Sequence, residues 1–261
     1  MSSLMFILTI FIIGFLGSFI SGMVGIGGAI INFPMLLYIP AMLGVAHFTS
    51  YEVSGITAIQ VFFASVSGAL AYRKGGYLNK TIVMYMGISI LAGSLAGAYL
   101  SSFMAENEID MVYGLLALAA AVMMFVPKKG LDSNEYDISR FNGIWASILA
   151  FIVGIGAGIV GAGGAFMLVP IMLLVLKIPV RMTIAASLAI TFISSIGSAA
   201  GKILTGQILY GPAAIMIIAS LISSPMGAKL GKKMDTKVLQ GILAVLILVT
   251  AIKIWLDLFD V

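Results

Sequence analysis

The chain has no cysteine, a single histidine and few charges: of its 261 residues only 9% are Asp, Glu, Lys or Arg. Without cysteine there is no disulfide and no thiol nucleophile. No Asp or Glu lies in the middle of an apolar run, so a carboxylate proton relay is not supported. No zinc-protease HExxH motif occurs, and His47 is expected in a loop. We therefore expect no enzyme, no cofactor and no metal site.

What the sequence has in excess is apolar residues, which make up 61% of the chain and give a mean hydropathy of +1.18. Soluble domains are nearer 45–50% apolar and about 25% charged. The composition predicts an all-α polytopic membrane protein with the lipid bilayer as a partner. The net charge of +4 lies mostly in short loops, so it indicates the orientation of the chain in the membrane more than the binding of nucleic acid. The first apolar run is expected to be a retained helix, not a cleaved signal peptide.

Ten apolar runs divide equally between the two halves, at about 4–21, 29–39, 53–72, 81–103, 110–127, 141–158, 165–176, 183–203, 208–228 and 237–256. The second run of each half is short and contains a proline. At 1.5 Å per residue it covers roughly half of the hydrocarbon core. Matching short segments interrupted by Gly and Pro are the sequence sign of discontinuous helices and a midplane binding site.

A glycine strip precedes each short run: GMVGIGGAIINFP at 22–34 returns as GIVGAGGAFMLVP at 158–170, an offset of 136. Glycine permits a left-handed backbone and close approach of a ligand, and the following helix starts with free N–H groups and a positive dipole end. Such a start binds anions. Close helix packing is the alternative. The repetition favours a site at the following residues: Gly25, Gly27, Gly28, Gly161, Gly163 and Gly164.

The likeness continues beyond the strips, pairing Ser54 with Ser187 and Gly97 with Gly227. It predicts a first repeat at 1–127, a cytoplasmic linker at 128–140 and a second repeat at 141–261. Equivalent basic loops fall on opposite sides if positive loops stay cytoplasmic, which indicates two inverted repeats of about five elements with both termini external. If the short runs are re-entrant, the alternative is eight crossings and parallel repeats.

Polar side chains recur on the apolar runs and add candidates for substrate binding. A hydroxyl stripe with helical spacing predicts a polar path, and hydroxyls bonding to their own backbone are the alternative. Lys202 is the cation on this stripe and attracts an anion or only snorkels. Asn32 has Leu168 as its counterpart, and it either distinguishes the two halves or forms an interhelical hydrogen bond. The candidates are Asn32, Ser54, Thr57, Gln60, Ser187, Thr191, Ser195 and Lys202.

The repeated GxGG-A-x4-P strips, the Ser-bearing run after each and the near-equal halves resemble the sulfite exporter TauE/SafE family of membrane permeases. The second-half strip is the better match, with Ile178-Pro179 and the Ala-Ala-Ser of residues 185–187 after it. The resemblance covers essentially the whole chain. It implies a prokaryotic inner-membrane permease for a small anion, mainly a sulfur oxyanion or an organosulfonate.

Together these observations predict a secondary transporter that moves a small anion, such as sulfite or sulfoacetate, across the plasma membrane by alternating access. The anion would bind near the midplane between the two helix starts. An anion channel and a cation-coupled carrier of another small organic acid remain as alternatives. A coupling ion (H⁺ or Na⁺) and a homo-oligomer are compatible with the sequence.

Overall fold

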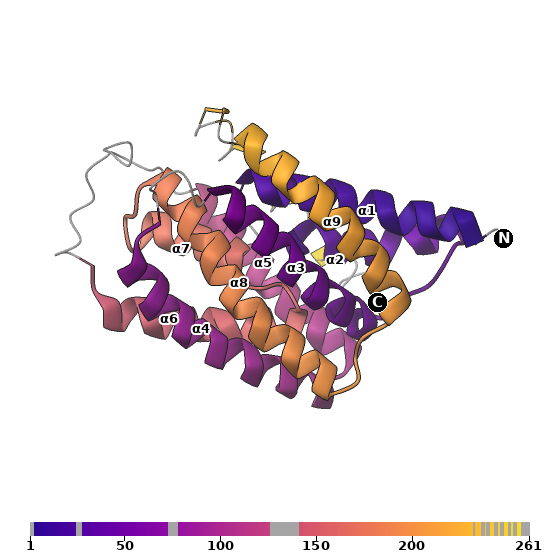
Figure 1. Cartoon of the computed structure of the whole chain (residues 1–261). Coiled ribbons are helices and arrows are strands. Elements are labelled where there is room, and N and C mark those ends of the chain that lie inside the picture. Colours follow the sequence, from indigo (N-terminus) through magenta and orange to yellow (C-terminus); the bar gives the residue numbers. More distant parts are fainter. Residues whose placement is uncertain are drawn as a thin grey trace.

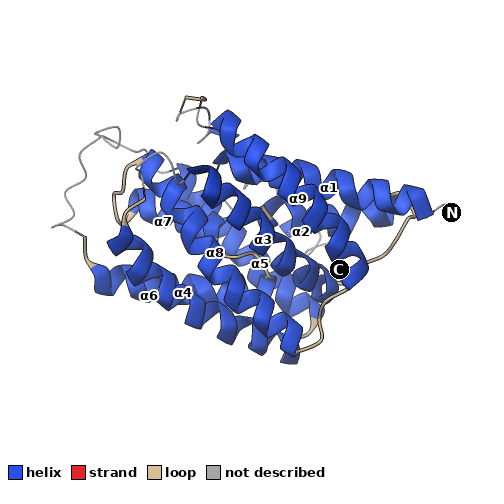
Figure 2. Cartoon of the chain, in the orientation of Figure 1, coloured by secondary structure: helices blue, strands red, loops and turns tan. Residues whose placement is uncertain are grey.

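The computed structural model describes residues 3–24, 28–72, 78–125, 141–231, 233–235 and scattered positions between 238 and 256. This part of the chain is helical and contains no strand (Figures 1 and 2). Gly25, Gly27, the predicted linker 128–140 and most of the tenth run lie outside the described residues. The helices are α1 (Ser3–Val24), α2 (Ala29–Met42), α3 (Ser50–Tyr72), α4 (Lys80–Leu100), the 3₁₀ turn η2 (Ser101–Phe103), α5 (Glu106–Phe125), α6 (Gly143–Val160), α7 (Ala165–Leu174), α8 (Val180–Leu204) and α9 (Tyr210–Gly231).

Local sequence explains where several helices begin. Asn79 accepts hydrogen bonds from Thr81 N and Ile82 N at the start of α4, and Asn142 accepts one from Trp145 N at the start of α6. Thr49 and Glu52 exchange side-chain and backbone hydrogen bonds at the start of α3, which is a capping box. These caps satisfy N–H groups that a helix start otherwise leaves unpaired.

The polytopic fold is confirmed. Six described helices are long and apolar enough to cross a membrane, and α2 and α7 are shorter apolar helices, as the short runs predicted. Both short helices contain proline, at Pro34 and Pro40 in α2 and at Pro170 in α7.

Contacts between helices fix their directions. Gly14 packs against Met216 and Phe19 packs against Gly227, so α1 and α9 are parallel. Gly55 packs against Gln207, just before α9, and Ser224 donates a hydrogen bond to Ala64 O, so α3 and α9 are parallel too. Likewise, α4 runs parallel to α6 and α8. Lys202, near the end of α8, bonds Ser54, near the start of α3, while Leu188 meets Gly68 near the end of α3. Thus α1, α3 and α9 point one way and α4, α6 and α8 the other.

The directions decide how the short helices are placed. Because α1 and α3 are parallel, the segment between them must return to the side where α1 began, and α2 lies on that return path (Figure 1). The same holds for α7 between α6 and α8. A re-entrant α2 would instead have made α3 antiparallel to α1. The geometry therefore favours α2 and α7 as crossing segments over re-entrant ones.

The two halves also make matching contacts. Gly97 packs on the carbonyl of Ile155, and Gly227 packs on the carbonyl of Phe19. The two glycines are 130 residues apart in the chain, and Phe19 and Ile155 are 136 apart. Ser94 Oγ donates to Ser194 O (2.8 Å), and Ser224 Oγ donates to Ala64 O (2.7 Å), both offset by 130. In α3 and α8 the matching offset is thus 130, so Thr57 and not Ser54 corresponds to Ser187. Equivalent helices run in opposite directions, which supports the inverted repeat; that relation stays a prediction.

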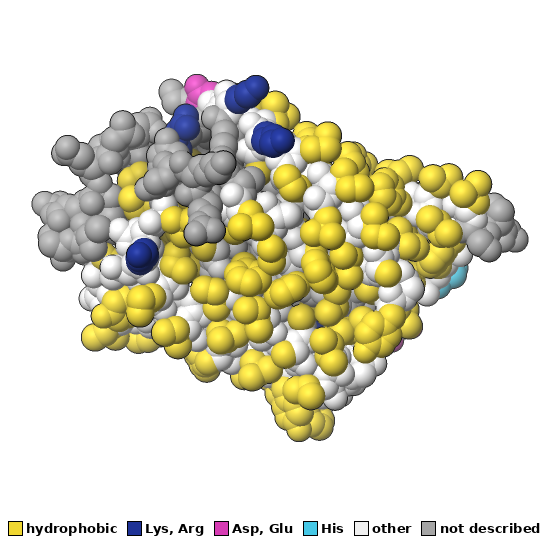
Figure 3. Space-filling model, viewed as in Figure 1, with side chains coloured by type: hydrophobic (Ala, Val, Ile, Leu, Met, Phe, Trp, Pro, Cys, Tyr) yellow, Lys and Arg dark blue, Asp and Glu magenta, His cyan; other side chains and the backbone are white. Residues whose placement is uncertain are grey.

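Apart from Asp235 at the basic end and the buried Lys202 at the acidic end, the charged side chains of the described residues separate by sign between the two ends of the bundle. Near the starts of α4 and α8 and the end of α9 lie Lys80, Lys177, Arg181, Lys229 and Lys233. Glu52, Glu106, Glu108 and Asp110 lie at the opposite end, near the starts of α3 and α5. Figure 3 shows Lys and Arg gathered near the end of α9 and an apolar surface over the face between the two ends. Positive loops stay cytoplasmic, so the basic end is expected to face the cytoplasm.

This orientation can be tested directly because the chain has no cysteine of its own. Ser102→Cys at the acidic end should react with a membrane-impermeant maleimide in whole cells, whereas Lys233→Cys at the basic end should react only after the membrane is permeabilised. Labelling of Lys233→Cys from outside would reverse the orientation.

Candidate functional site

The two short helices begin in the same way. Gly28 and Gly164 precede α2 and α7 with φ of 82° and 78°, in the left-handed region that favours glycine. Each glycine carbonyl accepts from two following N–H groups: Ile31 N and Asn32 N in α2, and Met167 N and Leu168 N in α7. The earlier N–H groups of each helix have no partner within the helix. Left-handed glycines at both breaks confirm the backbone conformation that the strips predicted.

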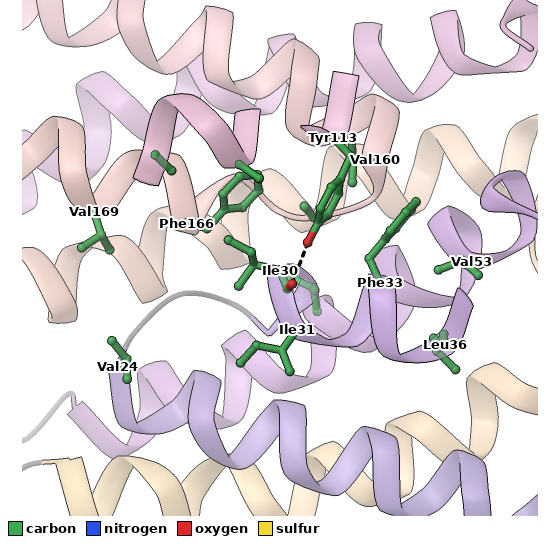
Figure 4. Packing of buried hydrophobic residues seen from close by; sticks show 14 of the residues in the cluster. Val24, Ile30, Ile31, Phe33, Leu36, Val53, Tyr113, Val160, Phe166 and Val169 are labelled. Atoms are coloured by element: carbon green, nitrogen blue, oxygen red, sulfur yellow. Dashed lines mark hydrogen bonds between the residues drawn. The ribbon is translucent and has the colours of Figure 1, made fainter. Parts of the chain in front are cut away.

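One aromatic side chain joins the two helix starts. Tyr113 of α5 stacks on Phe33 of α2, with ring centroids 4.7 Å apart, and lies 6.3 Å from the ring of Phe166 in α7. Its hydroxyl donates to Ile30 O, in the first turn of α2, over 2.6 Å (Figure 4). All of these side chains are buried. The first turns of α2 and α7 are therefore held against opposite sides of a single ring.

The second-half break packs where α3 and α8 cross. A Cβ on Gly163 would lie 2.7 Å from Val61 Cγ1 and 2.8 Å from Thr191 Cγ2, and Gly161 packs on the carbonyl of Ser54. Val61 and Thr191 are matching positions at the offset of 130, as are Phe62 and Phe192, whose rings are 5.5 Å apart. The break before α7 thus lies where matching residues of α3 and α8 contact each other.

The first-half break carries an amide cluster, formed by Ser18 of α1, Asn32 of α2 and Gln60 of α3. Asn32 lies against Gly17 and close to Gly28: a Cβ on Gly17 would overlap its amide, and one on Gly28 would be 3.4 Å from its Nδ2. Gln60 Nε2 donates to Ser18 Oγ over 2.5 Å. Three buried atoms of the cluster have no hydrogen-bond partner among the described residues: Asn32 Oδ1, Asn32 Nδ2 and Gln60 Oε1. The interhelical hydrogen bond considered for Asn32 is not present.

The hydroxyl stripe is divided in its bonding. Four hydroxyls donate to carbonyls of their own helix, which is the alternative considered from sequence: Ser54 to Tyr51 O, Thr57 to Val53 O, Ser187 to Ile184 O and Ser195 to Phe192 O. Their donation to an anion stays a prediction for another conformation. Thr191 Oγ1 is buried and has no hydrogen-bond partner among the described residues, while the Cγ2 methyl of the same side chain lies against Gly163.

Lys202 is fully buried, so its interpretation as a snorkelling residue is wrong. Its ammonium donates to Ser54 Oγ (2.8 Å), Ser101 Oγ (2.7 Å), Ile159 O (2.9 Å) and Gln207 Oε1 (2.7 Å). These acceptors are neutral and belong to both halves. We call Lys202 with these four groups the lysine tie; it joins the halves at the acidic end of the bundle. An anion-attracting role for Lys202 stays a prediction.

Sequence reasoning thus found the helix starts and most of the polar residues near them, and it missed Ser18, Ser101, Tyr113 and Gln207. Ser18 and Ser21 have helical spacing in an otherwise apolar run, a signal that was available. Tyr113 carried no such signal, because it is the single aromatic residue in the middle of its run. Within the described ranges, no three His, Asp or Glu side chains are grouped as a metal site.

Comparison with known proteins places the chain in a family. The model of the family "Sulfite exporter TauE/SafE" matches residues 10–254. The chain belongs to this family. TauE/SafE relatives include the probable membrane transporter protein YunE of Bacillus subtilis, 22% identical over 78% of this chain and 81% of its own length. The probable membrane transporter protein YdhB of the same species is 25% identical over 77% of this chain and 80% of its own length.

A probable membrane transporter protein of Methanocaldococcus jannaschii is 26% identical over 71% of this chain and 68% of its own length. No solved structure matches the chain. Membership of the TauE/SafE family makes the chain a multi-pass membrane transporter.

Replacement of Lys202 by Met should lower the melting temperature of the purified protein. The change leaves Ile159 O and Gln207 Oε1 buried without their charged donor, and a buried unsatisfied group costs about 1–3 kcal/mol. Lys229→Met, at an exposed position of α9, is the matched control and should melt with the parent. Equal melting temperatures for the two variants would show that the lysine tie adds no stability.

Proposed function

We propose that this TauE/SafE protein is a secondary transporter that moves a small anion, a sulfur oxyanion or an organosulfonate such as sulfite or sulfoacetate, across the prokaryotic plasma membrane. The observation that carries the proposal is the pair of short helices that begin at left-handed glycines inside the bundle, on opposite sides of Tyr113. Both positive helix ends are available to one anion without a charged side chain. The description of the family as sulfite exporters supports the substrate class.

Buried polar groups at these starts support a ligand site over simple packing. Asn32 lies beside the first turn of α2, and Thr191 beside the break before α7, and each carries buried polar atoms with no partner among the described residues. Buried polar atoms without a partner are rare in folded proteins. A bound anion would accept hydrogen bonds from the Asn32 amide and the Thr191 hydroxyl.

The arrangement of the halves supports alternating access as the mechanism. The lysine tie joins α8 and the end of α6 to α3 and the end of α4, and so closes the acidic end, which we expect to be external. Rocking of one half on the other at the crossing of α3 and α8 would break this tie and open a path to the helix starts. The coupling ion is H⁺ or Na⁺ in this scheme.

Gly163→Val should abolish transport and leave the protein folded. The added side chain would meet Val61 and Thr191 and would force a branched residue into a left-handed backbone at φ 64°. The measurement is sulfite-driven counterflow in proteoliposomes, which a carrier supports and a channel does not. Gly211→Ala is the matched control, because nothing lies within 4 Å of its added Cβ. Counterflow at the parent rate in Gly163→Val would contradict the site, and flux without counterflow would indicate a channel.

A further inference from the structure

The amide cluster of the first half has chemistry that bare helix starts lack. Asn32 is fully buried and neither atom of its amide has a hydrogen-bond partner among the described residues. Gln60 is fully buried too, and its Oε1 is also without a partner. Ser18, which accepts from Gln60, holds that side chain against α1. Asn32 thus brings one free acceptor and one free donor group to the start of α2, and Gln60 of α3, bonded to Ser18 on α1, carries a further free acceptor.

The second half has no polar side chain at the matching positions. Ser18, Asn32 and Gln60 correspond to Gly154, Leu168 and Ile190, at offsets of 136 for the first two and 130 for the third. Leu168 and Ile190 are fully buried and belong to one apolar cluster. The two helix starts therefore share a backbone conformation and differ in side chains, so recognition through amide side chains is confined to the first half.

The balance of donors and acceptors selects the ligand. An amide presents one oxygen that accepts and one NH₂ group that donates, whichever way it is turned. A fully ionised oxyanion has only acceptors, so it would place its negative oxygens against Asn32 Oδ1 and Gln60 Oε1. An oxyanion that keeps one O–H donates that hydrogen to an amide oxygen and accepts from Asn32 Nδ2 and from the N–H groups of α2. Its single negative charge still matches the positive end of the helix.

We infer that the amide cluster binds the singly protonated form of an oxyanion, an acid group with an O–H beside a charged oxygen, and so selects substrate by its proton. The inference rests on the proposed anion transport. It also gives the coupling proton a route, because a protonated anion carries its own proton across the membrane. No titratable protein side chain is needed for that step.

In this inference the pH dependence of binding comes from the anion, and the titratable side chains of the surrounding helices must be considered as another source. α1 carries no charged residue. Tyr113 of α5 donates its hydroxyl hydrogen to Ile30 O, and Glu52 binds the N–H of Thr49 at the far end of α3. The other titratable groups on α2, α3 and α5 are Tyr38, Tyr51, Tyr72, Glu106, Glu108 and Asp110. The helices α8 and α9, which pack against α3 and α1, add Arg181, Lys202, Tyr210 and Lys229. His47 lies exposed in the loop before α3 and is tested by a control substitution below.

The test is binding of sulfite to the purified full-length protein across a pH series, with methanesulfonate as the probe that holds no proton at these pH values. Apparent affinity for total sulfite should fall about tenfold per pH unit once the pH exceeds the pKa at which sulfite loses its remaining proton. Methanesulfonate should bind more weakly and without pH dependence. Asn32→Leu, which copies the second-half residue, should reduce sulfite affinity at least tenfold, whereas Leu168→Met should bind as the parent does. His47→Gln should retain the pH profile.

The outcomes separate this inference from the proposed function. Sulfite binding that is independent of pH, or unchanged in Asn32→Leu, overturns the selection of a protonated anion; if that binding is lost in Gly163→Val, the anion site itself stands. No binding of either anion at any pH overturns both. Gln60→Glu should weaken sulfite binding, because a second negative charge would face the ligand. Unchanged sulfite binding with tighter Na⁺ binding in this variant would assign the amide cluster to a cation and overturn the inference.

Discussion

Everything in this molecule depends on how two interrupted helices are accommodated inside an apolar bundle. A backbone that leaves the helical conformation at membrane depth exposes N–H and C=O groups, which lipid cannot satisfy. The TauE/SafE chain surrounds the breaks before α2 and α7 with protein: Gly163 lies against Val61 and Thr191, and Gly28 against α1 and Asn32. Glycine is required there because the backbone is left-handed and the neighbours leave no room for a side chain. The same constraint produces free helix starts, and these are the basis of the proposed anion site.

The matching contacts of the two halves account for how the long helices pack, and the positions at which the halves differ carry the polar side chains of the candidate site. Small residues on α1, α4, α6 and α9 let matched backbones approach closely, as in Gly97 on Ile155 and Gly227 on Phe19. Asn32 and Gln60 have no polar counterparts in the second half. Lys202 provides a further asymmetry, because its position at the end of α8 matches Tyr72 of α3 at the offset of 130. One half therefore supplies the amide cluster and the other supplies the cation of the lysine tie.

Much of the fold could be predicted from the sequence, because the signals for it are local. The glycine strips placed both breaks within a few residues, and the apolar runs located the long helices. The partners of polar groups could not be predicted in this way, because they depend on which helices meet. The hydroxyl stripe on α8 predicted a polar path, yet Ser187 and Ser195 donate hydrogen bonds to carbonyls of their own helix, whereas Thr191 does not. From the sequence, Lys202 was expected near a helix end, within reach of the membrane surface. It is fully buried, and its ammonium binds Ser54, Ser101 and Gln207, of which the first two are distant in the chain.

The central claim is that one small anion binds at the starts of α2 and α7. Its most direct test is the structure of the protein solved with selenite, whose selenium can be located by anomalous scattering. The account predicts one selenium position per chain, next to the first turn of α2, with a selenite oxygen within hydrogen-bond distance of Asn32. A selenium position only at the basic end of the bundle, near Lys229 and Arg181, would contradict it.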